Sequence, residues 1–427
     1  MSSRLLSRVA LSFTLSAMTP KTIAILGAGN RGTLFGDLIG RYSHLGRVAA
    51  VAEPLDDYRQ GFAEKHGIPS QNVLRTWQEF VQRPRLCDAV VVSTMDRDHV
   101  GPAVACLGLG YDVLLEKPMA ITLEDCRAIE AAQQESGAIV GVCHSLRYQK
   151  GFRKVKELLD AGAVGRVMSI DLLEQVAWWH QAHSFVRGRW GNSGRATFML
   201  LAKSCHDIDY LCCIVGQRCL RVSSFGHLSH FRRDNAPAGS AERCTDCAIE
   251  PSCPYSALRV YVEGKREEWP ASTISFDHSR EAHERAIETG PYGRCVWKCD
   301  NDAVDHQVVA LEFDGQITAT FTMTAFTQGG GRRLRVHGTE GELAFDEDAI
   351  TIRTFADANV QTISLGRETG GHGGGDERIL REWLLALHSR DASAVVANAQ
   401  ESLRSHAIVF AAEQSRLERR MVAMDEL

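Results

Sequence analysis

Three glycines near the amino terminus have the spacing of a phosphate-binding loop. Gly27, Gly29 and Gly32 form a G-x-G-x-x-G pattern, preceded by the apolar run IAIL and followed by TLFGDLIGRY, a stretch typical of a helix. In such a loop the first glycine permits a tight turn and the second lets the backbone approach a pyrophosphate. The third lets the helix pack on the strand, and the helix amino terminus attracts the phosphates. The pattern in this context predicts a dinucleotide-binding site.

An acid at the end of the next strand-like run, RVAAVAEP, bears on which dinucleotide binds. Glu53 is expected to accept hydrogen bonds from ribose hydroxyls and to repel a 2′-phosphate. It is followed by Pro54 and Leu55, so no adjacent cation offsets its charge. NAD is therefore predicted in preference to NADP. The expected cofactor-binding residues are Gly27, Gly29, Asn30, Arg31, Gly32, Glu53 and Glu116.

A lysine closes a later strand-like run, YDVLLEKP. Lys117 lies between Glu116 and Pro118, whose preceding peptide bond is a candidate for the cis form. In open parallel sheets ligands bind at the carboxyl ends of the strands. A lysine at this position is poorly placed for packing and well placed for proton transfer, so we expect Lys117 to be catalytic. The alternative is a solvated lysine without a chemical role.

The elements that must position these residues alternate between strands and helices. After the second strand come CDAVVVST, HVGPAVACLGLG, YDVLLEKP, TLEDCRAIEAAQQESG and AIVGVCHS, read as strand, helix, strand, helix and strand. Thr122 is a plausible N-cap of the second of these helices. The alternation predicts a doubly wound parallel sheet. From residue 306 onward, HQVVALEFDGQITATFTMTAF and RRLRVHGTEGELAFDEDAITIRTF alternate apolar and polar residues around turns, as antiparallel hairpins do. Two closing stretches have helical periodicity.

Together these motifs resemble the Gfo/Idh/MocA family of NAD(P)-dependent oxidoreductases. The likeness rests on AILGAGNRG, VAAVAEP, LLEKP and RYQKGFRKVKELLDAGAVGRV, and further on SCHDIDYL, VHGTEGEL and GGHGGGDE, so it spans the chain from about residue 21. It implies an α/β Rossmann domain over residues 21–145. An α+β domain with a large, mostly antiparallel sheet would follow over 146–427, containing a cysteine-bearing insertion around 240–300. In the family this sheet often forms oligomers, so we expect a homo-oligomer.

The resemblance also implies that a histidine acts with the lysine of the E-K-P motif at the reacting carbinol. Carried over, this is His206, which shares a helix face with Ala202 and Tyr210. Many family members have an acid where this chain has Ala202, so His206 lacks an expected orienting partner. Lys203 is a candidate to contribute instead, or is a solvated or phosphate-facing lysine.

Side chains suited to a polyhydroxylated substrate gather in EQVAWWHQAHSFVRGRW, residues 174–190. His180, His183 and Arg187 suit hydroxyl or acid groups, and Trp190 offers a face to a sugar ring. Two histidines three residues apart also suit a metal, but no third ligand is near in sequence, which favours substrate contact. His306 is a weaker candidate for the same site. GGHGGGDE lacks the lysine and Ser/Thr of a P-loop and is interpreted as a flexible loop, with His372 near substrate and Asp376 capping the next helix.

Three cysteines lie within ten residues in RCTDCAIEPSC. Cys244, Cys247 and Cys253 need a fourth ligand, and Cys295 is favoured over Cys299. Four thiolates suit tetrahedral Zn²⁺ in a closed structural site. We expect the polar insertion to bury little apolar surface, so that a metal supplies the stability that a hydrophobic core does not. The alternative is that these cysteines are free thiols, because the C-x2-C spacing often occurs by chance.

Composition narrows the class of protein. The chain has 427 residues, 44% hydrophobic and 24% charged, with a net charge of −5, and shows no basic run. Nucleic acid and an integral membrane location are therefore not expected. Residues 1–20 are either a mitochondrial targeting extension or an upstream start before Met18, and the second interpretation, with a cytoplasmic protein, is preferred.

Three functions fit these motifs. The leading hypothesis is an NAD-dependent oxidoreductase acting on a secondary alcohol of a sugar, cyclitol or related polyol. The second is a glycoside-cleaving enzyme that uses NAD for transient oxidation. The third is a dinucleotide-binding regulator without catalysis, which Ala202 keeps open and which Lys117 and His206 argue against.

Overall fold

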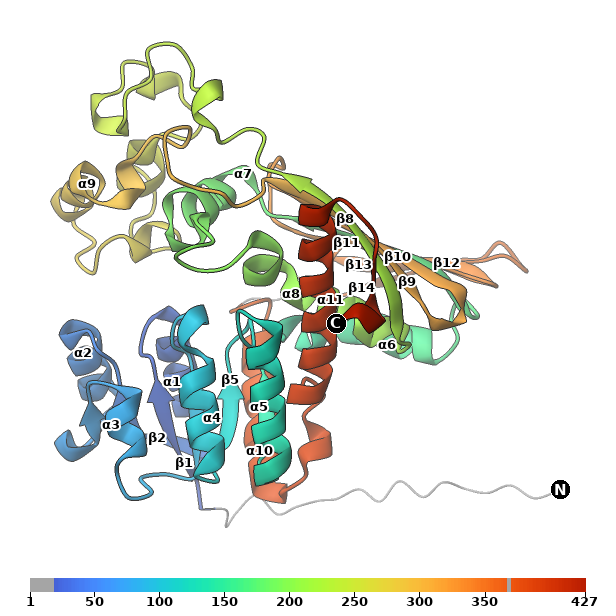
Figure 1. Cartoon of the computed structure of the whole chain (residues 1–427), viewed down its shortest axis with the longest axis horizontal. Helices are drawn as coiled ribbons and strands as arrows, with labels where there is room; N and C mark the ends of the chain where they lie inside the picture. The colour runs from blue at the N-terminus through green and yellow to red at the C-terminus, as the bar shows by residue number, and fades with distance from the viewer. Residues whose placement is uncertain (1–18, 367–369) are drawn as a thin grey trace.

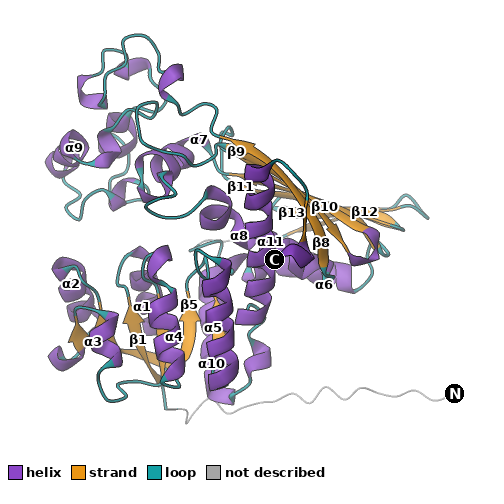
Figure 2. Ribbon diagram, viewed as in Figure 1, coloured by secondary structure: helices purple, strands orange, loops and turns teal. Residues whose placement is uncertain are grey.

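The computed structural model describes residues 19–366 and 370–427, so most of the predicted extension lies outside the described residues. Two sheets organise the chain, one below and one at the upper right in Figures 1 and 2. The first is a six-stranded parallel sheet in the order β3-β2-β1-β4-β5-β6. Its strands are β1 (Lys21–Leu26), β2 (Gly46–Ala52), β3 (Val73–Leu74), β4 (Ala89–Val92), β5 (Asp112–Leu115) and β6 (Val140–Val142). The predicted doubly wound sheet is confirmed.

Helices follow the first five strands, and α1, α4 and α5 lie where the sequence predicted helices. They are α1 (Asn30–Arg41), α2 (Asp56–His66), α3 (Trp77–Val81), α4 (Val100–Gly108) and α5 (Leu123–Ser136). Thr122 is the N-cap of α5, and its side chain accepts a hydrogen bond from the Asp125 amide at 3.1 Å. This satisfies one of the free N–H groups of the first turn.

The second sheet has nine strands in the order β14-β13-β12-β11-β7-β10-β9-β8-β15, and only β7 and β10 pair in parallel within the described residues. Its strands are β7 (Val167–Gln175), β8 (Cys219–His227), β9 (His306–Phe313), β10 (Ile317–Thr324), β11 (Gly331–Gly338), β12 (Gly341–Phe345), β13 (Ala349–Thr354), β14 (Val360–Ser364) and β15 (Val422–Ala423). The predicted hairpins are confirmed as β9–β10, β11–β12 and β12–β13.

Four further helices pack on the two sheets, and α11 contacts strands of both. They are α6 (Lys150–Asp160), α8 (Met199–Val215), α10 (Gly375–Ser389) and α11 (Ala399–Glu418). One apolar core joins Trp383 and Leu384 of α10 to Ile23 and Ile25 of β1. Helix α11 packs against α8, β8 and α5, so the carboxyl-terminal helices return to the Rossmann sheet (Figure 1).

The segment between β8 and β9 forms a separate lobe at the top of Figure 1, with α9 (Arg280–Thr289) as its longest helix. The expectation that it buries little apolar surface is wrong. Cys244, Tyr261, Val262 and Ile287 belong to one buried cluster within the lobe, and a second cluster forms around Phe231 and Trp297. Hydrophobic burial therefore contributes to the stability of this lobe without a metal.

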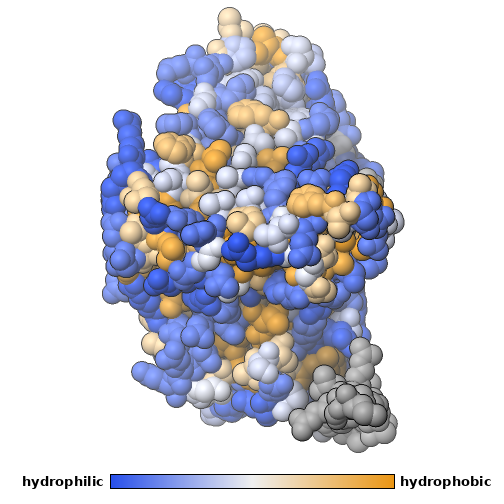
Figure 3. Space-filling view, turned by 90° about the vertical axis from the view of Figure 1, so that its right-hand side faces the viewer, coloured by the Kyte–Doolittle hydropathy of each residue, from blue (hydrophilic) through white to orange (hydrophobic). Residues whose placement is uncertain are grey.

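The side of the molecule that carries the second sheet is mostly polar, with scattered apolar residues (Figure 3). Phe225 on β8 is 70% exposed and Val308 on β9 is 41% exposed, and the two residues are register partners. Nowhere in the described part of the chain is there a helix long and apolar enough to cross a membrane.

Candidate functional site

The glycine loop has the geometry that phosphate binding requires. Gly27 adopts a φ of +94°, and a Cβ there would lie 2.5 Å from the carbonyl oxygen of Ser93. A Cβ on Gly32 would lie 1.9 Å from the carbonyl oxygen of Gly27, so close packing of α1 needs glycine there. Gly29 is the N-cap of α1, and a Cβ on it would have no described atom within 4 Å. That open side leaves the backbone amides free to face a pyrophosphate, so the residues fit a dinucleotide.

Glu53 lies at the end of β2 and is 7% exposed. Its Oε2 accepts a hydrogen bond from the Ala28 amide at 2.9 Å, and its Oε1 accepts one from the Leu55 amide at 3.0 Å. The carboxylate therefore braces the glycine loop. A carboxylate has about four acceptor sites, so two remain for ribose hydroxyls.

Arg31 has two acidic partners of its own. Its Nε donates to Glu116 at 2.6 Å, and its two terminal nitrogens donate to both oxygens of Asp376 at 2.8 Å. Asp376 also accepts from His372, at 2.9 Å. The predicted capping function of Asp376 is wrong, because Gly374 is the N-cap of α10 and no side chain caps it. Burial opposes ionisation of Asp376, but the charges of His372 and Arg31 hold its pKa well below the usual value.

Lys117 and His206 lie on facing elements. Lys117 follows β5, its peptide bond to Pro118 is cis, and its Nζ donates to the carbonyl oxygen of Ala202 on α8 at 2.7 Å. One turn further along α8, His206 is 1% exposed. Its ring lies edge-on to that of His372, with centroids 5.7 Å apart. The structure therefore brings together the lysine and the histidine that the family resemblance implied.

A buried ionic cluster, formed by Arg332, Asp207, Glu174 and Lys203, surrounds His206. Arg332 Nε lies 2.8 Å from Asp207 Oδ1 and 2.8 Å from Glu174 Oε2. Lys203 Nζ lies 2.9 Å from Glu174 Oε1. Arg332 and Glu174 face each other across β11 and β7. Neither was predicted from the sequence. The alternation in RRLRV indicates that one of its arginines points inward, but not which acid it meets.

The charges of this cluster act on the histidines. Burial lowers the pKa of His206 well below its usual value, and Lys117, Arg332, His372 and Lys203 lower it further. Burial also lowers the pKa of His180, helped most by Lys203. Both imidazoles are therefore neutral at physiological pH, in a site rich in cations.

His180 lies beside aromatic side chains at the edge of this cluster. Its ring centroid is 4.8 Å from that of Trp269, which is 45% exposed, and 5.8 Å from that of Trp179. The helical turn that carries His180 (α7, Trp178–His180) continues into η5 (Gln181–Arg187). Lys203 and His180, both predicted to contact substrate, thus lie near Lys117 and His206.

Three other predicted substrate residues make their polar contacts away from Lys117 and His206, although the His183 ring also lies 5.5 Å from that of Trp269. His183 contacts the Tyr261 hydroxyl at 2.9 Å and stacks on Tyr292, both in the lobe. Arg187 donates to the carbonyl oxygens of Arg294 and Tyr255, each at 2.7 Å. His306 lies on β9 against Asp305. His183 and Arg187 contact residues of the lobe because η5 packs against it. The sequence pattern did not predict this packing.

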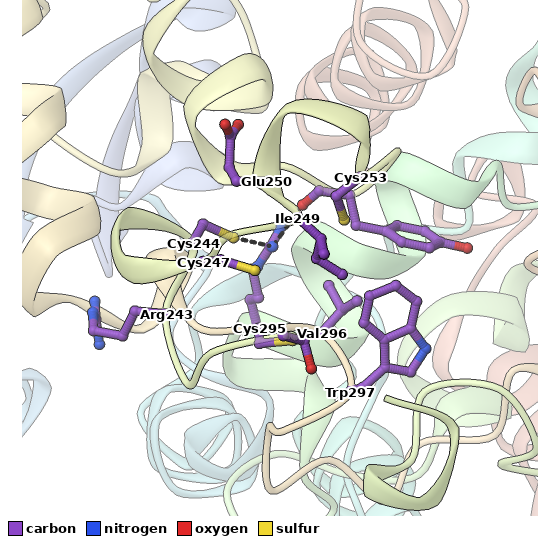
Figure 4. Close-up of a pocket in the computed structure, with 12 residues that line it drawn as sticks. Arg243, Cys244, Cys247, Ile249, Glu250, Cys253, Cys295, Val296 and Trp297 are labelled. Carbon is purple, nitrogen blue, oxygen red and sulfur yellow. Dashed lines mark hydrogen bonds between the residues drawn. The ribbon is translucent and has the colours of Figure 1, made fainter. Parts of the chain in front are cut away.

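The cysteine motif encloses a small cavity (Figure 4), whose lining includes Cys244, Cys247, Cys253, Cys295 and Arg187. Cys299 instead donates to the carbonyl oxygen of Cys295 at 3.3 Å. In the described ranges no three His, Cys, Asp or Glu side chains are arranged to hold a metal ion, so the predicted zinc site is not supported. The Arg187 guanidinium enters this space and lies 3.4 Å from Cys244 Sγ.

Comparisons with known proteins agree with the fold. A family model described as "Oxidoreductase family, NAD-binding Rossmann fold" (GFO_IDH_MocA) matches residues 21–144. Its companion, "Oxidoreductase family, C-terminal alpha/beta domain", matches residues 156–424. Together the two models account for most of the chain.

Individual relatives are more distant. A protein named "Putative oxidoreductase YteT" from Bacillus subtilis is 27% identical over 359 residues, which cover 80% of this chain and 82% of that protein. The scyllo-inositol 2-dehydrogenase (NADP(+)) IolW of the same bacterium is 26% identical over 192 residues, 44% of this chain and 49% of that protein. A solved structure of levoglucosan dehydrogenase with NADH and levoglucosan has a TM-score of 0.71 and 16% identity, and covers 95% of this chain and 100% of that one. This last likeness is one of fold.

Proposed function

Because the chain belongs to the Gfo/Idh/MocA family of oxidoreductases, we propose that it transfers a hydride between NAD and a secondary alcohol of a sugar, cyclitol or related polyol. The observation that carries the proposal is the convergence of Lys117 and His206 at the carboxyl edge of the sheet that bears the glycine loop. Ligands bind at this edge in doubly wound sheets. YteT, which this chain resembles over most of its length, is named as an oxidoreductase.

Each residue of the site has a task in this reaction. A bound nicotinamide ring supplies the acceptor for the hydride that leaves the carbinol carbon. Lys117 accepts the hydroxyl proton, and its contact with the Ala202 carbonyl at 2.7 Å fixes the position of its amine. The neutral His206 hydrogen-bonds the reacting oxygen. The cis-linked strand end and α8 hold the two groups on either side of the substrate.

A polyhydroxylated substrate is supported by the groups around this pair. Lys203 and His180 supply hydrogen-bonding groups, and relatives that match in part are named as cyclitol and sugar enzymes. Trp269 and Trp179 offer aromatic faces beside His180, their ring centroids 5.3 Å apart. Aromatic faces pack on the apolar faces of sugar rings.

Cofactor preference and assembly belong to the same proposal. Glu53 favours NAD because its carboxylate occupies the place that a 2′-phosphate would approach. The exposed pair Phe225 and Val308 on the second sheet favours a homo-oligomer formed through that sheet.

Two measurements test the proposed activity. The nucleotide that copurifies with the protein is identified, and a panel of polyols and sugars is then screened for NADH formation by absorbance. We expect NAD-dependent oxidation of at least one cyclitol or sugar. Binding of nucleotide with no redox turnover on any of them would instead support a regulator.

A second candidate is favoured by one contact. Phe276 of the lobe packs on Tyr58 of α2, with ring centroids 4.3 Å apart. Tyr58 in turn lies near Glu53, the acid proposed to bind the ribose. A lobe that closes over the adenosine end would retain the nucleotide through repeated cycles, as transient oxidation during glycoside cleavage requires. Sugar release from a glycoside without net NADH formation would identify this activity.

A further inference from the structure

His206 receives a hydrogen bond from an arginine on the second sheet. Arg332 Nη2 lies 3.0 Å from His206 Nε2, and both side chains are buried. The nearest carboxylate, Asp207 Oδ2, is 3.6 Å from the same nitrogen, beyond hydrogen-bonding distance. The arginine is therefore the group that determines how this imidazole is protonated.

A guanidinium has donors only, so His206 Nε2 has to be the acceptor. The proton of a neutral imidazole then resides on Nδ1. That atom is buried and has no hydrogen-bond partner among the described residues. An unpaired N–H of this kind costs free energy unless a ligand accepts from it.

Every strong charge that acts on His206 opposes a second proton. The ring faces Lys203 on its own helix, Arg332 on β11 and His372 before α10, and Lys117 after β5 adds to them when its amine is protonated. Asp207 is adjacent, but it is shared with Arg332 at 2.8 Å. The imidazole therefore stays neutral in the resting protein.

We propose that Arg332 is the positioning residue of His206, holding it as the neutral Nδ1–H form so that it donates a hydrogen bond to the substrate oxygen and does not act as the base. This inference rests on the proposed function and deepens it. On oxidation the hydroxyl proton goes to the deprotonated amine of Lys117, which becomes the ammonium, and the hydride goes to NAD⁺, giving ketone and NADH, while His206 keeps its proton and stabilises negative charge on the oxygen. Arg332 thus takes over the orienting task left open by Ala202.

Arg332 is held for this task by its acids. Glu174 and Asp207 each lie 2.8 Å from its Nε, and Lys203 shares Glu174. Asp207 Oδ2 also lies 3.3 Å from Nη2, so the acids hold the Nε edge of the guanidinium while Nη2 reaches His206. Because such donors are already oriented, no free energy is needed to reorganise them during the reaction.

The test reads the imidazole itself in full-length protein labelled with ¹⁵N-histidine. The His206 signals are assigned by their loss in His206→Asn. We expect ring-nitrogen shifts of the Nδ1–H form that do not titrate between pH 8 and 6. A wild-type His206 protonated on Nε2, or charged in this range, overturns the proposal whether or not a polyol substrate has been found.

Two variants separate positioning from structure. Arg332→Lys keeps the charge beside Asp207 and Glu174 but loses the forked geometry, so the His206 shifts should move toward a tautomer mixture. With a substrate in hand, kcat should fall roughly tenfold to a hundredfold with NAD affinity retained. The control is Arg333→Lys, on the exposed face of the same strand, which should change neither the His206 shifts nor kcat. Unchanged His206 shifts in folded Arg332→Lys would overturn the assignment.

Discussion

The side-chain nitrogen of Lys117 donates a hydrogen bond to the carbonyl oxygen of Ala202, with 2.7 Å between Nζ and O. The acceptor belongs to the backbone, so the contact does not depend on the side chain at position 202. The residue that departs from the family pattern therefore still locates the lysine. His206 lies one helical turn away on the same face of α8.

The first prediction concerns Lys117. Lys117→Ala should lower turnover by at least roughly a hundredfold, because positioned acid–base groups typically contribute that much. Binding of NAD should be retained, since the glycine loop lies on another strand. Lys65→Ala, in which an exposed lysine of α2 loses its pair with Asp37, is the matched control and should keep full turnover. Turnover in Lys117→Ala comparable to that of the wild type would show that a group other than Lys117 accepts the hydroxyl proton.

The second prediction uses Glu53 to separate charge from structure. Glu53→Gln keeps an acceptor for one of the amides of Ala28 and Leu55 but removes the negative charge, so it should narrow the preference for NAD over NADP. Glu53→Ala should narrow it too and also lower the free energy of unfolding by about 1–3 kcal/mol, because buried amides lose their partner. Nucleotide titrations and urea unfolding measure the two effects. A wild-type protein that prefers NADP contradicts the idea.

Local sequence patterns were sufficient to predict five of the six strands of the first domain, β1, β2, β4, β5 and β6. The glycine spacing, Glu53 and Lys117 all lie at strand ends, and strand ends follow from apolar runs and turn residues in the adjacent sequence. The paired hairpins of the second sheet were equally predictable, because the turn residues lie between the strands they join.

The surroundings of His206 were not predictable in this way. Glu174 and Arg332 are register partners on β7 and β11, more than 150 residues apart in the chain, and nothing in either segment specifies that pairing. The same limit explains why the contacts of His183 and Arg187 with the lobe were not predicted. Helical periodicity identifies a face of η5, but only the packing of the lobe decides what that face meets.

The third prediction concerns the contact between Phe276 and Tyr58. The rings meet edge to face at 67°, and Phe276 is otherwise 63% exposed, so this contact is a small link between lobe and Rossmann domain. Aromatic pairs contribute about 0.5–1.5 kcal/mol. If the lobe covers the adenosine end, Phe276→Ala should speed release of NAD by roughly twofold to tenfold, measured by stopped-flow fluorescence.

The control for this variant is another exposed phenylalanine. Phe355 is 64% exposed at the end of β13, and Phe355→Ala should leave the release rate unchanged. Equal release rates in both variants and the wild type would show that the lobe does not retain the nucleotide.

The last prediction concerns stability at mildly acidic pH. Burial lowers the pKa of His144 to about 4 and those of His183 and His406 to about 3. Above pH 6.5 these histidines are neutral in both states and contribute no pH dependence. Below it the unfolded chain binds protons that the folded chain excludes, so the free energy of unfolding falls by about 1.4 kcal/mol per pH unit for each histidine.

Two carboxyl groups act in the opposite direction. Burial raises the pKa values of Asp207 and Glu347, so these two groups increase the free energy of unfolding as the pH falls. The histidines with lowered pKa values outnumber them, because His180 and His206 join the three above. Urea unfolding at pH 7.5, 6.5 and 5.5 should therefore show a steep loss of stability below pH 6.5. His183→Gln should make that loss shallower, since it removes one excluded proton. A free energy of unfolding that stays constant down to pH 5.5 would show that the buried imidazoles are already protonated in the folded protein.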